Sequence, residues 1–139
     1  MSKIIVSACL VGKNCRYDGG NCYNNKLIEF LKSKEYIAAC PEELGGLSTP
    51  RLPCEREEDK VFNKANEDVT TEFNSGANEF LQLALANSCK LAILKSDSPS
   101  CGKGIIYDGS FSGKLTAGNG VTTQLLLKHG IKVITEKEL

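Results

Sequence analysis

Three cysteines occupy positions from which they could act together. Each one follows a short apolar segment of the kind that forms a buried β-strand. The cysteines are Cys9, Cys40 and Cys101, and the segments before them are Lys3–Ala8, Tyr36–Ala39 and Leu91–Lys95. Because ligand sites of open parallel sheets collect at the carboxyl ends of the strands, the spacing predicts that these thiols converge on one edge.

Three converging thiols can bind a metal in two ways. One is a zinc ion with an open fourth position, and the other is an iron–sulfur cluster with one iron that lacks a protein ligand. Such an iron is a Lewis acid that can hold a sulfur or oxygen atom of a substrate. The single histidine, His129, falls at the end of a predicted helix and is expected to face away from this edge.

Polar residues beside these cysteines favour a reactive site. Glu42 lies two residues after Cys40 and can serve as a general acid or base. Ser98 and Ser100 precede Cys101, and their hydroxyls can hydrogen bond to a ligand or relay a proton. Gly102 lets the backbone approach a bound group closely. The ordinary alternatives are an exposed glutamate and a turn serine.

Two further segments are candidates for the wall of a pocket. The segment "NCRYDGG" carries Arg16, Tyr17 and Asp18, and the segment "STPR" carries Thr49 and Arg51. An arginine offers a planar fork to carbonyl groups, and a tyrosine offers a face on which a heterocycle can stack. We therefore expect Arg16, Tyr17 and Asp18 to contribute to substrate binding.

The total of seven cysteines is odd, and no Cys-x-x-Cys pair occurs. No secretory signal is evident, so a disulfide framework is a poor interpretation of this count. Most of these cysteines, taken one at a time, are expected to be small buried apolar side chains.

The order of predicted elements is that of an α/β protein. Helices are expected within 24–34, 68–89 and 118–130, with Asn119 capping the last one, and further strands at 60–63 and 131–134. Residues 40–55 are expected to be an irregular loop without a long helix, the acidic segment 54–60 a solvated loop, and Asp108-Gly109 a hairpin or a tight turn. We expect one Rossmann-like domain over 1–139, with a mostly parallel sheet and helices on both faces.

Composition limits the classes of function. The 17 basic and 17 acidic residues give a net charge of zero, which provides no global argument for nucleic acid or an anionic membrane. No apolar run approaches the roughly 20 residues that span a bilayer, so a cytoplasmic location and no membrane association are expected. The oligomeric state is not predicted.

Five blocks of the sequence, in order and over nearly the whole chain, resemble the TudS-like family of thiouracil desulfidases, once known as domain of unknown function 523. The blocks are "VSACL", "CRYDGG", "CPEELGGLSTPR", "LAILKSDSPSCG" and "IYDGSFSGKL" with the segment that follows. The resemblance implies a 4Fe-4S cluster with three cysteine ligands, Cys9, Cys40 and Cys101, and one open iron.

The resemblance also implies an activity. The thiocarbonyl sulfur of a thiouracil would bind the open iron, and water would replace it at carbon without net electron transfer, giving uracil and sulfide. Glu42 would be the general acid or base and Ser100 would assist proton movement. Some relatives carry an RNA-binding domain, which this sequence lacks, so the expected substrate is a small thiolated nucleobase or nucleoside.

Two hypotheses from other classes stay open. The chain could be a cluster-binding or sulfur-handling module without turnover of its own. It could also be a thiol enzyme in which Cys101 is a free nucleophile, activated at the start of a helix.

Overall fold

Four short strands form one parallel sheet in the computed structural model, which describes residues 3–139. The strands lie in the order β2-β1-β5-β8, and every neighbouring pair is parallel. Their bounds are Ile4–Ser7 for β1, Tyr36–Ala39 for β2, Leu91–Leu94 for β5 and Lys132–Thr135 for β8. The sheet is therefore the mostly parallel one that the sequence predicts, while the finer Rossmann-like class stays a prediction, as does one domain over 1–139.

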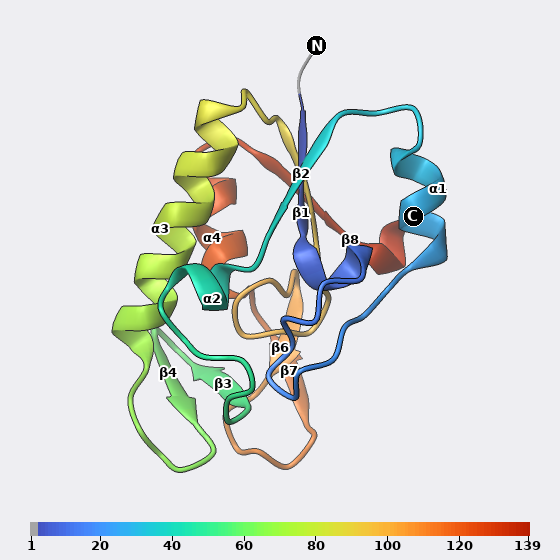
Figure 1. Cartoon of the computed structure of the whole chain (residues 1–139). Coiled ribbons are helices and arrows are strands. Elements are labelled where there is room, and N and C mark those ends of the chain that lie inside the picture. Colours follow the sequence, from blue (N-terminus) through green and yellow to red (C-terminus); the bar gives the residue numbers. More distant parts are fainter. Residues whose placement is uncertain (1–2) are drawn as a thin grey trace.

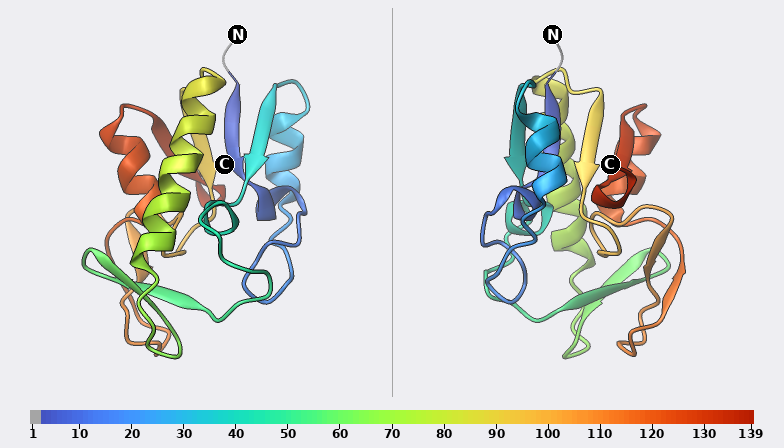
Figure 2. Two further views of the ribbon diagram at one scale, coloured as in Figure 1. Left: turned by 60° about the vertical axis from the view of Figure 1, so that its left-hand side comes forward. Right: turned by 90° about the vertical axis from the view of Figure 1, so that its right-hand side faces the viewer.

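Helices cover both faces of this sheet (Figures 1 and 2). Helices α3 (Thr70–Ala86) and α4 (Val121–Lys128) lie on one face, and α1 (Asn25–Leu31) lies on the other. The alternation along β1 explains this division, since Ile5 packs in the core of α3 and α4 whereas Val6 packs beside α1.

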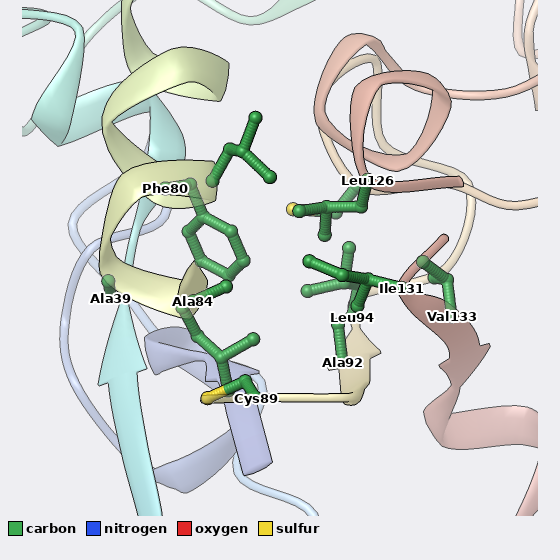
Figure 3. Packing of buried hydrophobic residues seen from close by; sticks show 12 residues of the cluster. Ala39, Phe80, Ala84, Cys89, Ala92, Leu94, Leu126, Ile131 and Val133 are labelled. Atoms are coloured by element: carbon green, nitrogen blue, oxygen red, sulfur yellow. The ribbon is translucent and has the colours of Figure 1, made fainter. Parts of the chain in front are cut away.

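The larger core lies between α3, α4 and the sheet. Figure 3 shows Phe80 and Ala84 of α3 gathered with Leu126 of α4 and Leu94 of β5. The helical spacing of apolar residues in α3 predicts this buried face, and the side chain of Phe80 has no exposed surface. This core fixes the positions of the strands whose carboxyl ends form the predicted site.

Two antiparallel hairpins lie beyond the carboxyl edge of the sheet (Figure 1). One pairs β3 (Cys54–Glu57) with β4 (Lys60–Asn63), and the other pairs β6 (Ile105–Tyr107) with β7 (Leu115–Ala117). The hairpin signal at Asp108-Gly109 is confirmed, although the connection between β6 and β7 runs from Asp108 to Lys114 and is longer than a tight turn.

One prediction about loops is wrong, and another is right only in part. The acidic segment 54–60 contains β3, because Glu55 and Arg56 find partners in distant parts of the chain. Glu55 Oε1 accepts hydrogen bonds from the N–H groups of Gly109 and Phe111, at 3.0 and 3.1 Å. The expected loop 40–55 begins with the single-turn helix α2 (Pro41–Leu44), which carries proline at its start.

The cap predicted for α4 is also wrong. The helix begins at Val121 and its N-cap residue is Gly120. The side chain of Asn119 instead accepts a hydrogen bond from the N–H of Gly104 at 2.8 Å. A Cβ atom on Gly120 would lie 2.4 Å from the carbonyl carbon and oxygen of Ser100, so only glycine permits this close approach.

Within residues 3–139, no helix combines the length and the hydropathy that crossing a bilayer requires.

Candidate active site

A cavity of about 390 Å³ opens at the carboxyl edge of the sheet. Cys9, Cys40 and Cys101 all line it. Cys9 lies in the 3-10 helix η1 (Ala8–Val11) directly after β1, and Cys40 is the N-cap residue of α2 directly after β2. Strands β1 and β5 are neighbours whose chain connections leave in opposite directions, which is where open α/β sheets bind ligands.

Most of the cysteines gather around this cavity. Besides the three predicted ones, the cavity is lined by Cys15, Cys22 and Cys54. Only Cys89 lies elsewhere, buried in the core between α3 and the sheet. All seven are free thiols. The interpretation of these cysteines as ordinary buried side chains therefore fits Cys89 better than the other six.

The backbone and the sulfur of Cys101 are held by several partners. Its N–H donates to Ser98 Oγ at 2.7 Å, and its carbonyl oxygen accepts from Thr123 Oγ1 at 2.8 Å. The Ser7 hydroxyl donates to its Sγ at 3.4 Å. Burial raises the pKa of the Cys101 thiol to about 12. A free nucleophile needs a lowered pKa, so this environment argues against Cys101 as an activated thiol on its own.

Cys15 lies directly beside two of the predicted ligands. The hydrogen bond with Cys40 lowers the pKa of the Cys15 thiol, but the hydrogen bond with Cys9 and burial outweigh it and raise that pKa to about 12. The hydrogen bond between Cys15 and Cys40 also raises the pKa of the Cys40 thiol, and burial is the second cause of that rise. A cation at this place would favour the thiolate forms that these surroundings otherwise disfavour.

Glu42 lines the cavity and forms an ion pair with Arg51. The distance from Arg51 Nε to Glu42 Oε1 is 3.0 Å, and both side chains are largely buried. Burial raises the pKa of Glu42, and the Arg51 guanidinium opposes part of that rise. The carboxyl can therefore hold a proton nearer to neutral pH than an exposed glutamate, which suits a general acid or base.

Two of the three predicted binding residues line the cavity, and the third supports them. Arg16 and Tyr17 line the cavity, and the Arg16 guanidinium lies 5.4 Å from the centre of the Tyr17 ring. Arg16 Nη1 also donates to Cys22 Sγ at 3.4 Å. Asp18 does not line the cavity, and its Oδ1 accepts from the N–H of Gly20 at 2.9 Å. Asp18 therefore supports the turn that carries Arg16 and Tyr17.

The residues around Cys101 divide into two groups. Ser98 lines the cavity, and its Oγ also accepts from the N–H groups of Ser100 and Cys101. Ser100 is buried outside the lining and its Oγ lies 2.9 Å from Thr122 Oγ1. Gly102 is also absent from the lining, and a Cβ there would lie 2.7 Å from Ile106 Cγ2.

The lining includes residues that the sequence did not indicate. These are Ser7, Glu55, Lys95, Asp97 and Tyr107, among others. Ser7 and Asp97 lie close in sequence to predicted residues, so proximity could have pointed to them. Glu55 and Tyr107 come from the two hairpins, and no local pattern places either one at this edge.

The whole chain is similar to known proteins. A family model described as 2-thiouracil desulfurase matches residues 4–138. The uncharacterized protein YbbK of Bacillus subtilis (strain 168) is 44% identical over 146 residues, which cover 98% of this chain and 97% of that protein. A solved structure described as the 4Fe-4S-dependent thiouracil desulfidase TudS superposes with a TM-score of 0.94 at 48% identity, covering 100% of this chain and 93% of that one.

Proposed function

The chain belongs to the 2-thiouracil desulfurase family, and we propose that it removes the thiocarbonyl sulfur of a thiouracil or a related thiolated base, giving uracil and sulfide. The observation that carries this proposal is the cavity at the carboxyl edge of the sheet, which six cysteines and the buried pair of Glu42 and Arg51 line. The similar solved structure, described as a thiouracil desulfidase, supports it.

The residues of the cavity fit a 4Fe-4S cluster. Cys9, Cys40 and Cys101 would hold it, because thiolates are the ligands that such clusters take. The dependence of the similar solved structure on a 4Fe-4S cluster supports the same cofactor here. When bound through three cysteines, the cluster supplies one iron without a protein ligand, which acts as a Lewis acid toward the thiocarbonyl sulfur.

The proton chemistry falls to Glu42. Replacement of sulfur by oxygen consumes one water and releases hydrogen sulfide, so a proton must leave the water and protons must reach the sulfur. Glu42, as a carboxylate, would take one proton from the attacking water and pass it to the departing sulfur; the second proton of that water would reach the sulfur as the new carbonyl group forms. The ion pair with Arg51 fixes the orientation of the carboxyl and keeps it ionisable despite its burial.

The remaining residues would bind the substrate and support the site. Tyr17 would stack on the pyrimidine ring, and Arg16 would donate to its remaining carbonyl oxygen. Ser98 would be the hydroxyl that faces the substrate, because it lines the cavity, while Ser100 would assist through the turn. Asp18 and Gly102 would shape the loops rather than touch the substrate.

The expected substrate is a small thiolated nucleobase or nucleoside. A cavity of about 390 Å³ lies in the range of small-molecule sites, which begins near 300 Å³. A cytoplasmic location and action without membrane association belong to the same proposal.

Anaerobic reconstitution tests this function. The protein is purified without oxygen, its iron and sulfide are counted, and it is incubated with 2-thiouracil or 4-thiouracil before chromatography. Four irons for each chain together with stoichiometric release of uracil and sulfide are expected. A colourless protein that holds zinc and no iron after reconstitution would refute the proposal.

A second candidate is a cluster-binding or sulfur-handling module without turnover. The three cysteines that line the cavity beyond the expected ligands, Cys15, Cys22 and Cys54, are the observation that favours it. The same incubation separates the candidates, because a module of this kind would bind the cluster and form no uracil.

A further inference from the structure

We propose that the cluster-free protein has a zinc site made by Cys15, Cys40 and Glu43, which overlaps the expected cluster site at Cys40 alone. The Sγ atoms of the two cysteines and a carboxylate oxygen of Glu43 all lie within 4.8 Å of one another. Neither Cys15 nor Glu43 is among the three expected cluster ligands. This inference does not depend on the desulfidase activity.

The three ligand atoms lie almost at the spacing that zinc needs. Bond lengths of about 2.0–2.3 Å in a tetrahedral site place ligand atoms about 3.3–3.8 Å apart. Because the three atoms lie within 4.8 Å of one another, a closure of at most about 1–1.5 Å would fill three of the four tetrahedral positions. A water molecule would take the fourth position, as it does in zinc sites with three protein ligands.

Two of the three proposed ligands, Cys15 and Glu43, are held by neighbours that do not bind the metal themselves. The carbonyl oxygen of Cys15 accepts from Arg51 Nη2 at 2.9 Å, which fixes the backbone of that turn. Glu43 Oε1 pairs with Lys13 Nζ at 3.0 Å, and Glu43 Oε2 accepts from Thr49 Oγ1 at 2.6 Å. Partners of this kind orient a ligating carboxylate and leave its other lone pairs free.

The donor set selects zinc over the hard cations. Two sulfur ligands exclude magnesium and calcium, which take oxygen, whereas zinc accepts sulfur and carboxylate together. Two thiolates and one carboxylate carry three negative charges against the two positive charges of zinc, and Lys13 beside Glu43 offsets the excess.

Sharing Cys40 makes the two sites mutually exclusive. Zinc on Cys15 and Cys40 removes one of the three sulfurs that the cluster needs, so bound zinc must be displaced before the cluster assembles. Zinc therefore competes with cluster assembly through the shared Cys40, while Cys15 and Glu43, which the cluster does not use, set the affinity for zinc.

The test measures zinc affinity and cluster loading on the same variants. The cluster-free full chain, reduced and free of oxygen, is titrated with zinc against a chromogenic chelator. One zinc for each chain is expected. The C15A and E43Q substitutions should each weaken zinc binding by about tenfold or more, yet both variants should still take up four irons when reconstituted without zinc.

Two variants serve as controls. C101S should lose the cluster and keep the zinc affinity of the unaltered chain within about twofold, because Cys101 is not a zinc ligand here. C89A removes another buried cysteine, one that lies outside the cavity, and should change neither property. Circular dichroism of every variant verifies that the fold is retained.

The outcomes are distinct. If C101S weakens zinc as strongly as C15A does, zinc occupies the cluster site and the proposal is wrong. Absence of stoichiometric zinc binding to the unaltered chain also overturns it. A chain that binds zinc as expected but never forms uracil would refute the proposed function alone.

Discussion

The hydroxyl of Ser7 lies 3.4 Å from the sulfur of Cys101, and the same oxygen accepts the N–H of Lys95 at 3.0 Å. Ser7 is 2% exposed, so water does not compete for these contacts. Because the Lys95 N–H already occupies an acceptor site, the single hydroxyl proton is directed to the sulfur. This hydrogen bond links the end of β1 to the cysteine that follows β5.

The S7A substitution should weaken the binding of the 4Fe-4S cluster by the protein. A hydrogen bond to a charged group contributes about 1.5–3 kcal/mol, which corresponds to about tenfold or more in rate or affinity. We expect iron release to a chelator to be about tenfold faster. The reduction potential of the cluster should fall, because one fewer hydrogen bond stabilises the added negative charge.

The matched control for S7A is T123V. Thr123 donates to the carbonyl oxygen of Cys101 rather than to its sulfur, and it is equally buried. T123V should loosen the turn that carries Cys101 without lowering the reduction potential of the cluster. Equal potentials in S7A and the unaltered protein would contradict the assignment of the proton to the sulfur.

The E42Q substitution should abolish most of the turnover while the cluster remains. Loss of a general acid or base lowers kcat by about 10²–10⁴. The iron content is expected to match that of the unaltered protein, and E29Q on the exposed surface of α1 is the control. Retention of kcat within about twofold in E42Q would remove Glu42 from the proposed chemistry. Melting temperatures are compared as well, because Arg51 loses its ion pair.

The G120A substitution should disrupt the turn that presents Cys101. The new methyl group would lie 2.4 Å from Ser100 and 2.6 Å from the nitrogen of Cys101, and neither backbone segment can move without displacing the thiol. We expect a loss of about 1–3 kcal/mol in the free energy of unfolding, together with a loss of cluster binding. G113A, with a φ of 79° and open space around it, measures the cost of backbone strain alone. Equal iron content in the two variants would contradict this account.

The F80A substitution should destabilise the fold without altering the chemistry of the site. Phe80 is fully buried against α4 and the sheet, and such truncations cost about 3–5 kcal/mol in the free energy of unfolding. Denaturant unfolding measures this loss, and L85A, at a position that is 50% exposed on the same helix, should change it by less than about 1 kcal/mol.

The sheet and its helices could be predicted because their signals are local. The β-branched run before Cys9 and the helical spacing of Phe73, Phe80 and Leu81 each specify one element and its buried face. Once four strands are placed in parallel, the meeting of Cys9, Cys40 and Cys101 follows from strand direction alone.

The rest of the site depends on partners far away in the sequence. The sequence does not predict strand β3, because its charged residues are typical of a solvated loop. The partner of Glu55 in the structure is the N–H of Gly109, which lies 54 residues later. Likewise, the choice between Ser98 and Ser100 depends on Thr122, which holds the Ser100 hydroxyl away from the cavity. The residues that reach the site from the hairpins, Glu55 and Tyr107, were therefore beyond the reach of local patterns.

The two hairpins beyond the sheet have a consequence for how this protein can change. The thiols of Cys9, Cys40 and Cys101 belong to the sheet edge, whereas Glu55 and Tyr107 reach the cavity from the hairpins. Hairpin loops tolerate insertion and substitution far better than buried strand ends. A new substrate preference can therefore be acquired by altering the hairpins, at little cost to the sheet edge that carries the three thiols.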